Sequence, residues 1–441
     1  MSLPTLETIQ KLQMALHAKA KGDPKFRFYA LYDKVYRKDV LWFALRRCRN
    51  NGGVPGVDGQ AFEDIEKYGE REWLEELAEE LRTKTYQPQP VRRVYIPKAD
   101  GKKRPLGIPT IKDRVVQTAL LIVLEPIFEA DLPDEQYAYR ADHSALDAVK
   151  AVHKLLKEGY QEVVDADLSG YFDSIPHAEL MQCIARRVSD KAVLHLLKMW
   201  LVAPAEEMDD RGHIHRTTRN QDEGRGSPQG APISPLLANL YMRRFVLGWK
   251  SLGHEQRFGA RIVNYADDFV ICCRSKAQRA AEAMRAMMER LKLTVNEQKT
   301  KCCRVPSESF DFLGYTFGRC YRPKDGRAYI GTYPAKKKVR KLCESIDELT
   351  DRKSLWQDPE QLVGQLNRRL RGWAGYFYLG PVSKAYRAVD AHVARRLRKW
   401  LCKKRKQRGR GKNRYRDDYL YDTLGLVQLP QRTRNFPWAK A

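Results

Sequence analysis

The residues of this chain best suited to chemistry are two adjacent carboxylates, Asp267 and Asp268, which follow Tyr265 and an alanine. Short apolar runs at 261–264 and 269–273 flank them, a pattern that predicts a β-hairpin with the acids at its turn. Neighbouring carboxylates repel each other, and a hard divalent cation such as Mg²⁺ offsets that repulsion. The pair therefore indicates a metal-dependent site, although two acids at a turn are also an ordinary surface feature.

A third carboxylate lies upstream, where another apolar run leads into a turn. Asp165, Asp167 and Asp173 all compete for this role. Alternate residues of a strand share a face, so Asp165 and Asp167 should point the same way. We favour Asp167 because it lies nearest the turn, and we expect Asp165 to face solvent and Asp173 to cap the next turn. Three such acids would suit two-metal phosphoryl transfer.

A predicted hairpin turn carries the cations Lys98, Lys102, Lys103 and Arg104. Flexible cations opposite a metal site could hold a triphosphate. A solvated basic turn would have the same composition, so the residues alone leave both interpretations open. Arg114 is a weaker candidate for which a structural salt bridge is the simpler role.

The segment 226–235 is rich in Gly and Pro and predicts a loop that enters a helix. Within it Gln229 offers a donor and an acceptor, which suits contact with a base or a sugar edge, and a rigid helix entry would explain the same residues. Phe172 lies five residues after Asp167 and could sit beneath a nucleotide sugar. Aromatic side chains usually pack in cores, so the local pattern alone favours packing.

Net charge points to a polyanionic partner. The 441 residues include 81 Lys and Arg against 55 Asp and Glu, a formal charge of +26. The excess is concentrated at 336–416, which holds 25 Lys or Arg and 7 Asp or Glu. Binding of nucleic acid through such a surface should depend strongly on salt. The cations that we expect to contact RNA are Lys336, Lys337, Lys338, Arg340, Arg368, Arg369 and Arg371.

Cysteine usage and hydropathy bear on the compartment. Nine cysteines, an odd number, fit neither a zinc site nor a disulfide framework, which favours a reducing environment. No apolar run approaches 18 residues, and the N-terminus lacks the apolar core of a signal peptide. We expect a cytoplasmic protein of bacterial type, associated with nucleoid or RNA and without a membrane partner.

The order of elements indicates an α+β fold. Apolar spacing predicts helices at 5–20, 31–49, 61–83, 112–129, 144–157, 177–202, 235–250 and 276–291. Beside the strands already named, we expect strands at 91–96, 293–304 and 310–317, and an interruption of the fourth helix at Pro126. Helices and strands alternate without a strict βαβ rhythm, and the chain beyond about 335 is helical and basic.

Taken in order, these motifs resemble those of group II intron-encoded reverse transcriptases, also called maturases. The resemblance runs from about residue 27 to the C-terminus and is carried by 53–59, 96–98, 104–109, 165–173, 227–230, 234–239, 265–268, 295–300, 312–314 and 372–377. It implies a right-hand polymerase of fingers, palm and thumb, the helical basic thumb being the maturase X domain. The domains expected are an N-terminal extension with the start of the fingers (1–90), the reverse transcriptase domain (91–320), the thumb (335–402) and a basic tail with the character of a remnant DNA-binding segment (403–441).

The resemblance also implies roles for individual residues. Asp167, Asp267 and Asp268 match the catalytic metal ligands, which hold two Mg²⁺ ions with Mn²⁺ as a substitute. Residues matching nucleotide contacts are Lys98, Arg104, Phe172, Gln229 and Lys299. Phe172 falls at the sugar-gate position, which reverses the preference for plain packing, and Lys299 matches a motif proposed to assist departure of pyrophosphate. Phe312, Leu313 and Gly314 match the primer grip.

Departures from the family pattern are few. Ala138 to His143 keep only Arg140 of the usual run, and Ala231 stands where a second glycine is common. Many relatives end in a nuclease domain with Cys and His ligands, and this chain offers too few, so we expect it to lack DNA cleavage. The expected partners are intron or template RNA, a DNA primer or target and dNTPs, with the oligomeric state open. Alternative functions are a domesticated relative in DNA repair or phage defence, and an RNA-folding chaperone with incidental polymerase activity.

Overall fold

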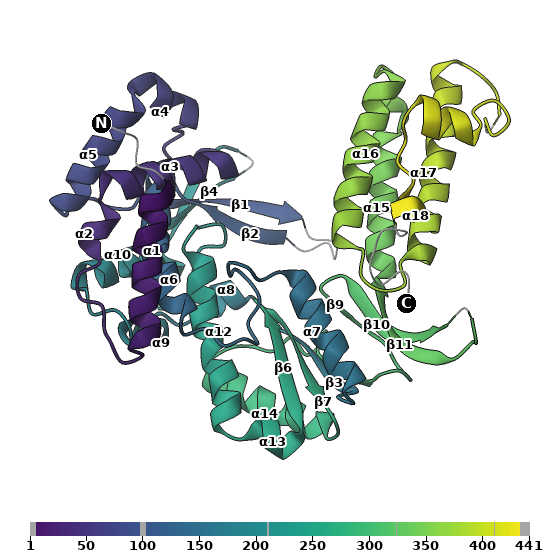
Figure 1. Cartoon of the computed structure of the whole chain (residues 1–441). Helices are drawn as coiled ribbons and strands as arrows, with labels where there is room; N and C mark the ends of the chain where they lie inside the picture. The colour runs from purple at the N-terminus through teal and green to yellow at the C-terminus, as the bar shows by residue number, and fades with distance from the viewer. Residues whose placement is uncertain (1–5, 98–102, 210, 323, 410, 433–441) are drawn as a thin grey trace.

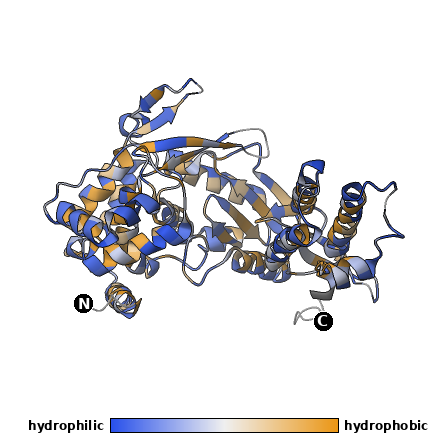
Figure 2. Cartoon of the chain, turned by 90° about the horizontal axis from the view of Figure 1, so that it is seen from above, coloured by the Kyte–Doolittle hydropathy of each residue, from blue (hydrophilic) through white to orange (hydrophobic). Residues whose placement is uncertain are grey.

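The computed structural model describes residues 6–97, 103–209, 211–322, 324–409 and 411–432. Figure 1 shows a half-open hand: helices of the first 130 residues and the β1–β2 hairpin on one side, an antiparallel sheet at the base, and a helical bundle on the other side. We call these parts the fingers, the palm and the thumb. Figure 2 shows that most helices carry both apolar and polar residues along their length, as expected where one side of each helix packs on its neighbours.

The fingers combine a helical layer with a four-stranded sheet. Their elements are α1 (Leu6–Gly22), α2 (Tyr32–Val35), α3 (Lys38–Asn51), α4 (Phe62–Tyr68), α5 (Glu70–Arg82), β1 (Val91–Pro97), β2 (Lys103–Ile108) and α6 (Ile111–Glu129). The sheet runs β2-β1-β4-β5, and its last two strands come from much later in the chain. They are β4 (Ala205–Met208) and β5 (Ile214–Thr217), which the sequence did not predict.

Three predictions about helices in this region were wrong. The helix expected at 61–83 is two helices, because Gly69 adopts a left-handed φ of 114° between α4 and α5. The helix expected at 31–49 also divides, into α2 and α3. Pro126, by contrast, does not interrupt α6, since it lies in the last turn and the buried Ile127 and Phe128 beyond it keep packing in the core.

The palm is built on a sheet of order β6-β7-β3-β8, antiparallel throughout. Its elements are α7 (Ala145–Lys157), β3 (Glu162–Asp167), α8 (Tyr171–Ser174), α9 (His177–Ala185), α10 (Lys191–Val202), α11 (Arg219–Asp222), α12 (Ser234–Ser251), α13 (His254–Phe258), β6 (Ala260–Tyr265), β7 (Asp268–Cys273), α14 (Ala277–Arg290) and β8 (Lys301–Arg304). The helix expected at 177–202 is two, since Asp190 caps α10 by accepting from the amides of Ala192 and Val193. The strand expected at 293–304 is also shorter: 293–300 form an irregular connection before β8.

A three-stranded sheet joins the palm to the thumb. It contains β9 (Phe310–Phe312), β10 (Tyr315–Tyr321) and β11 (Ala328–Pro334), in the order β11-β10-β9. The thumb follows with α15 (Lys336–Leu349), the 3₁₀ turn η1 (Arg352–Ser354), α16 (Pro359–Tyr376), α17 (Ser383–Lys404), the π-helical turn η2 (Tyr419–Thr423) and α18 (Leu429–Arg432). Tyr415, Leu420 and Leu429 pack into the thumb core, so the segment after 402 adds to the thumb's packing. The four predicted domain boundaries stay predictions.

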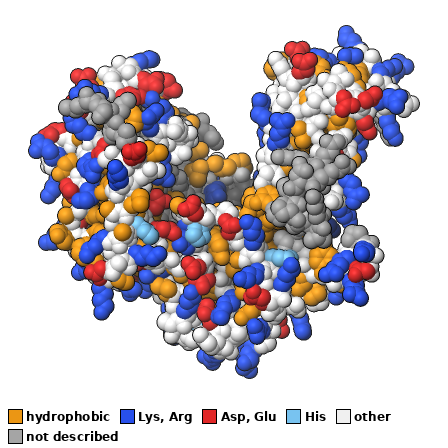
Figure 3. Space-filling view, viewed as in Figure 1, with side chains coloured by type: hydrophobic (Ala, Val, Ile, Leu, Met, Phe, Trp, Pro, Cys, Tyr) orange, Lys and Arg blue, Asp and Glu red, His pale blue; other side chains and the backbone are white. Residues whose placement is uncertain are grey.

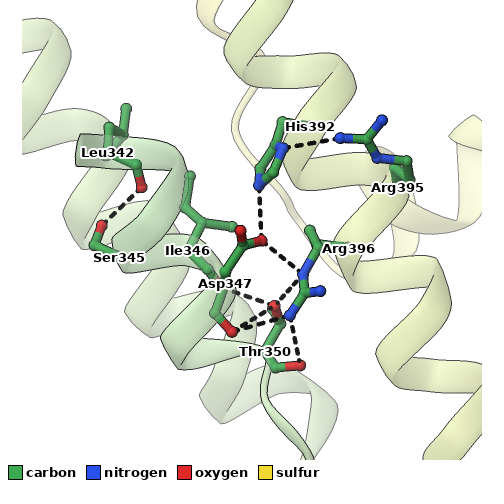
Figure 4. A network of polar contacts seen from close by, with 8 residues as sticks. All are labelled: Leu342, Ser345, Ile346, Asp347, Thr350, His392, Arg395 and Arg396. Atoms are coloured by element: carbon green, nitrogen blue, oxygen red, sulfur yellow. Dashed lines mark hydrogen bonds and ion pairs between the residues drawn. The ribbon is translucent and has the colours of Figure 1, made fainter. Parts of the chain in front are cut away.

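A polar network fastens α15 to α17 inside the thumb (Figure 4). Asp347 of α15 pairs with Arg396 at 2.8 Å and with His392 at 2.9 Å. The Arg396 guanidinium also donates to the Thr350 hydroxyl and to backbone carbonyls at the end of α15. A cation at a helix C-terminus both satisfies free carbonyls and opposes the negative end of the helix dipole. The network therefore fixes how the two helices are aligned.

Asp390 gives the thumb a predicted pH dependence. Its carboxylate accepts from the backbone amide of Leu429, and partial burial raises its pKa from 3.8 to about 6. Between these values the folded chain holds a proton that the unfolded chain has lost, so this group lowers the free energy of unfolding as pH rises. Asp390→Asn keeps an oxygen for Leu429 and should stabilise the thumb above pH 6 by about 1 kcal/mol, a modest gain because the carboxyl is only partly buried.

Thermal melts of wild type and Asp390→Asn between pH 4 and 7 measure this effect. The difference in melting temperature should grow as pH rises and level off above pH 6. A difference that stays constant over that range would contradict the assignment.

None of the described helices combines the length and the apolar character needed to cross a bilayer.

Candidate active site

The palm sheet brings the predicted acids together. Strands β3 and β7 pair so that Asp167 lies directly opposite Asp268, which sets their Cα atoms about 5 Å apart. Asp267 occupies the turn between β6 and β7, as the sequence predicted. The turn is tight because Ala266 adopts a left-handed φ of 57°, and the buried Asn264 side chain donates to the Ala266 carbonyl at 2.8 Å. A backbone device thus holds both acids of the hairpin beside the third.

The site carries an excess of negative charge that its cations offset only in part. Asp268 still reaches solvent, but protein atoms crowd around it, and this desolvation raises its carboxyl pKa from 3.8 to about 7. The charges of Asp267, Asp167 and Asp165 add to that rise. Desolvation likewise raises the pKa of Asp267, with Asp167 contributing. Carboxylates that are costly to ionise together are stabilised when a cation lies between them.

Asp167 has two partners from the connection that precedes β8. Its Oδ2 accepts from the Asn296 amide at 3.0 Å and pairs with the Lys299 ammonium at 3.0 Å. Asn296 also donates its backbone amide to the Asp167 carbonyl at 2.8 Å. Sequence reasoning placed Lys299 among nucleotide contacts and missed Asn296, although both lie in one quoted motif. The irregular connection at 293–300 therefore positions a catalytic candidate.

The donor set suits a hard divalent cation. Three carboxylates supply the oxygen ligands that Mg²⁺ prefers, and their mutual repulsion is what bound cations would relieve. Within the part of the chain that the structure describes, no group of three or more His, Cys, Asp or Glu side chains is placed so that it could hold a metal ion as it stands. The fit consequently rests on the chemistry and charge of these acids.

Asp165 does not lie where it was expected. It is half-buried on β3, on the same side as Asp167, and not turned to solvent. Burial raises its carboxyl pKa to about 6, and the nearby Lys301 and Lys337 ammonium groups partly offset this. Its register partner on β8 is Lys301, which supplies the closest charge of opposite sign on the sheet. Asp173, the other competitor, is exposed on α8.

A cavity of about 570 Å³ lies between the fingers and the palm and collects three predicted nucleotide contacts. Arg104 of β2, Phe172 of α8 and Gln229 all line it, and the Arg104 guanidinium donates to the Gln229 side-chain oxygen at 3.0 Å. Phe172 is only 6% exposed, which suits a rigid wall. Lys98, also predicted as a nucleotide contact, lies outside the described residues. Lys299 sits apart from these three, on Asp167.

The loop before α12 is fixed against β2. The Gly107 amide donates to the Gln229 carbonyl at 2.7 Å, and a Cβ on Gly230 would come within 2.9 Å of the Gly107 carbonyl oxygen. Ala231, where the family often has glycine, is buried and lines the same cavity. The two interpretations of this loop, rigid helix entry and ligand contact, are thus compatible.

Other residues of the cavity were missed or misjudged. Arg47 and Tyr139 line it, and Tyr139 is strained, with a φ of 56° and a side chain 49% exposed. No spacing pattern in the sequence signals a bulky residue held in that conformation. Arg114 also lines the cavity and donates to the Pro109 and Val54 carbonyls, so the expected salt bridge was wrong. Arg140, the one residue kept from the family's run, pairs with Glu129 at 2.6 Å and is structural.

The predicted primer grip touches the thumb. Leu313 and Gly314 both adopt left-handed backbone conformations, with φ values of 49° and 85°. The Tyr376 hydroxyl, at the end of α16, donates to the Leu313 carbonyl at 2.7 Å. Gly314 lies under the Phe377 ring and the Lys338 side chain, where a Cβ would meet carbons at 3.2–3.3 Å. The turn is therefore held from the thumb side.

The seven cations predicted to bind RNA are all exposed. Lys336, Lys337, Lys338 and Arg340 lie at the start of α15, and the others lie on α16. Lys337 pairs with Asp311 of β9 at 3.2 Å, which links this cluster to the palm side. In Figure 3 the molecule is hollowed between fingers and thumb, and basic side chains lie along the thumb flank of the hollow.

Comparison with known proteins agrees with this arrangement. Residues 96–317 match the reverse transcriptase (RNA-dependent DNA polymerase) family, and residues 339–419 match the group II intron, maturase-specific domain. Protein YkfC of Escherichia coli is 34% identical over 77% of this chain and 96% of its own length. The group II intron-encoded protein LtrA of Lactococcus lactis is 34% identical over 51% of this chain, but only 36% of LtrA is covered.

Among solved structures, a chain of a partial Cas6-RT-Cas1–Cas2 complex superposes with a TM-score of 0.36 at 23% identity, over 59% of this chain and 41% of that one. That likeness is too weak to build on, and the assignment rests on the two family matches and YkfC. The chain belongs to the reverse transcriptase family, with a group II intron maturase-specific domain following its polymerase domain.

Proposed function

We propose that this protein is the RNA-directed DNA polymerase of a group II intron and also binds its intron RNA to assist splicing and mobility. The observation that supports the proposal most strongly is the register of β3 and β7, which pairs Asp167 with Asp268 beside Asp267. Roles in DNA repair or phage defence, or as an RNA chaperone, are not favoured, because a maturase-specific domain follows the polymerase domain.

In the proposed mechanism Asp167, Asp267 and Asp268 would hold two Mg²⁺ ions, which Mn²⁺ could replace. When bound, such cations activate a primer 3′-hydroxyl and neutralise a leaving pyrophosphate. The hydrogen-bonded pair of Arg104 and Gln229 orients the dNTP from the fingers side, and Phe172 limits the room at its sugar. Lys299, beside Asp167, supplies positive charge as pyrophosphate departs.

Primer extension with the purified full chain tests the polymerase half of this proposal. A labelled DNA primer on an RNA template should be extended with dNTPs and Mg²⁺, and chelation should stop it. No extension with either Mg²⁺ or Mn²⁺ would reject the function. A splicing assay with the RNA that flanks the coding sequence tests the maturase half.

Tyr376→Phe should weaken use of the primer. The substitution removes the hydroxyl that holds the Leu313 carbonyl and leaves the ring packing against Phe377. Loss of one such hydrogen bond is worth about 1 kcal/mol, so extension at subsaturating primer–template should fall roughly fivefold. Tyr321→Phe, on the exposed end of β10, is the matched control and should extend normally. Equal rates for both variants would remove the proposed role of this contact.

Neutralising the start of α15 should weaken RNA binding. Replacing Lys336, Lys337, Lys338 and Arg340 with Gln removes four exposed charges, so fewer counterions are released when RNA binds. The plot of log K against log salt should become shallower by about 2 to 3. Filter binding measures this slope between 50 and 300 mM salt, roughly the range over which such contacts are screened. An unaltered slope would place the RNA surface elsewhere. The control variant replaces four exposed cations of the N-terminal helices with Gln: Lys11, Lys21, Lys67 and Arg71.

A further inference from the structure

A second cavity, of about 250 Å³, shares no lining residue with the cavity of the candidate active site. Its walls come from the turn after α1, the ends of α6 and α9 and the middle of α12, which Figure 1 shows gathered on the fingers side of the palm. A cavity in which several charged groups converge is a usual form of a small-ligand site. We call it the arginine pocket and define it by Phe128, Asp131, Cys183, Arg186, Arg187 and Arg243.

One of the three arginines is already neutralised and is part of the wall. Arg187 is 4% exposed, and its Nε lies 3.2 Å from the Asp131 carboxylate. Its terminal nitrogens donate to three backbone carbonyls at the end of α1 and just beyond it, those of Ala20, Asp23 and Phe26. Arg187 therefore fixes the chain after α1 and uses the negative charge of Asp131.

The other two arginines line the pocket without a carboxylate of their own. The Nε of Arg243 donates to the backbone carbonyl of Asp131 at 2.8 Å, which holds this guanidinium at the pocket wall. Among the described residues, none accepts a hydrogen bond from its two terminal nitrogens. Arg186 follows α9 directly, is exposed, and has no ion-pair partner in the same described ranges. Once Arg187 and Asp131 are paired, two positive charges therefore remain.

The excess positive charge shows in the neighbouring groups. Burial lowers the pKa of the Arg243 guanidinium; Asp131 opposes this shift, and Arg186 adds to it. Burial raises the pKa of the Cys183 thiol, and the surrounding guanidinium groups oppose that rise. Cations that are partly desolvated and repel one another are stabilised by an anion placed between them. The pocket is therefore suited to a negatively charged ligand.

Charge and shape favour a phosphate monoester as that ligand. Above about pH 6 a monoester carries close to two negative charges, which match those of Arg186 and Arg243. A planar guanidinium donates in parallel to two phosphate oxygens. A backbone phosphodiester carries one charge and continues on both sides, which suits an open groove more than a cavity walled by Phe128 and Leu240, 1% and 4% exposed. The exposed Arg186 marks the side from which a ligand enters.

We propose that the arginine pocket binds a phosphate monoester, the group that a free nucleotide and the 5′ end of a nucleic-acid strand share. Arg243 and Arg186 donate to the phosphate oxygens, and Arg187 keeps the Asp131 carboxylate paired so that it repels the ligand less. The pocket contains none of the active-site acids, so this function is separate from polymerisation. A bound phosphate would join the end of α6 in the fingers to α9 and α12 in the palm.

Alkylation of cysteines in the full chain reports occupancy at the pocket itself. Cys183 lines the pocket, whereas Cys302 is exposed on β8 and serves as the internal control. Adenosine monophosphate should slow the reaction of Cys183 with iodoacetamide about fivefold or more, because the bound phosphate blocks the thiol and disfavours its thiolate. Cys302 should react at an unchanged rate, and adenosine, which lacks the phosphate, should protect neither thiol. Mass spectrometry of the digested protein measures both rates.

Two variants test the arginines. Arg186→Gln removes an exposed charge, and Arg243→Gln keeps a donor for the Asp131 carbonyl. Each should raise the adenosine monophosphate concentration that gives half-protection of Cys183 about tenfold, since each loses a charged hydrogen bond. Arg279→Gln removes an exposed charge from α14, outside the pocket, and should behave like wild type. Melting temperatures without ligand show whether each variant is folded.

Further probes separate the two sources of the phosphate. Protection by inorganic phosphate and adenosine monophosphate alone would assign a free ligand, and protection by a 5′-phosphorylated oligonucleotide would assign a strand end. Three results would overturn the pocket: no protection of Cys183 by any of these at roughly 10 mM, equal protection by an oligonucleotide with a 5′-hydroxyl, or unchanged half-protection in both folded arginine variants. Because no step requires DNA synthesis, the outcome does not depend on the proposed polymerase function.

Discussion

Asp267→Asn should lower cDNA synthesis by about a thousandfold or more while RNA affinity changes less than about twofold. The variant loses the charge of one predicted metal ligand, and the turn that presents it is held by Asn264 and Ala266, which stay in place. The basic surface of the thumb is untouched, so the electrostatic part of RNA binding persists. Primer extension and filter binding on the same preparation measure the two quantities.

The matched control is Asp33→Asn, which removes an exposed carboxylate from α2 on the fingers. It should leave both quantities unchanged. Desolvation raises the carboxyl pKa of Asp268 most, and the charge of Asp267 raises it further. Removing that charge in Asp267→Asn should therefore also raise the melting temperature of the metal-free protein slightly. Full-length cDNA from Asp267→Asn would remove this residue from the site.

Phe172→Ala should let the enzyme incorporate ribonucleotides. The ring is 6% exposed and forms part of the wall of the cavity, so its removal opens volume where a 2′-hydroxyl would lie. The preference for dNTP over rNTP should fall by one to two orders of magnitude, measured as the ratio of kcat/KM values. Since a buried Phe→Ala change costs about 3 to 5 kcal/mol, Phe172→Val is a milder companion that should shift the ratio in the same direction.

Leu121→Ala is the control for cavity size, since Leu121 lines the same cavity from α6. It enlarges the space at another wall and should leave the sugar preference intact. An unchanged dNTP/rNTP ratio in Phe172→Ala, with the fold retained in melts, would reject the gate. A shift caused equally by Leu121→Ala would attribute the effect to volume alone.

The parts of the fold that sequence predicted well are those written in short local patterns. The hairpin around Asp267 and Asp268 follows from alternating apolar runs and a turn, and the register with Asp167 follows from the position of each acid at a strand end. Nearness to the turn already favoured Asp167 among the upstream acids, and the family motifs agree with that choice. Their catalytic role stays a prediction, since position and charge are what the structure supplies.

What sequence missed depends on partners remote in the chain. Strand β4 is four residues long and mixes charge with one methionine, and its partner β1 precedes it by more than a hundred residues. No local periodicity reveals such a pairing. Asn296 lies in a stretch with the apolar content of a strand, but its bonds to Asp167 hold the backbone in an irregular connection. Asp165 was misplaced because its burial comes from strands β7 and β8 on either side of β3, which are remote in the chain.

The hydroxyl of Tyr376 has a mechanical consequence. Tyr376 is the last residue of α16, and its hydroxyl donates a hydrogen bond to the Leu313 carbonyl. The end of a growing DNA strand is expected to lie at Leu313. Gly314 also lies against the Phe377 ring. A rotation of the thumb would therefore move the predicted primer grip with it. Grasping a nucleic acid and aligning the tip to be lengthened would then be a single movement.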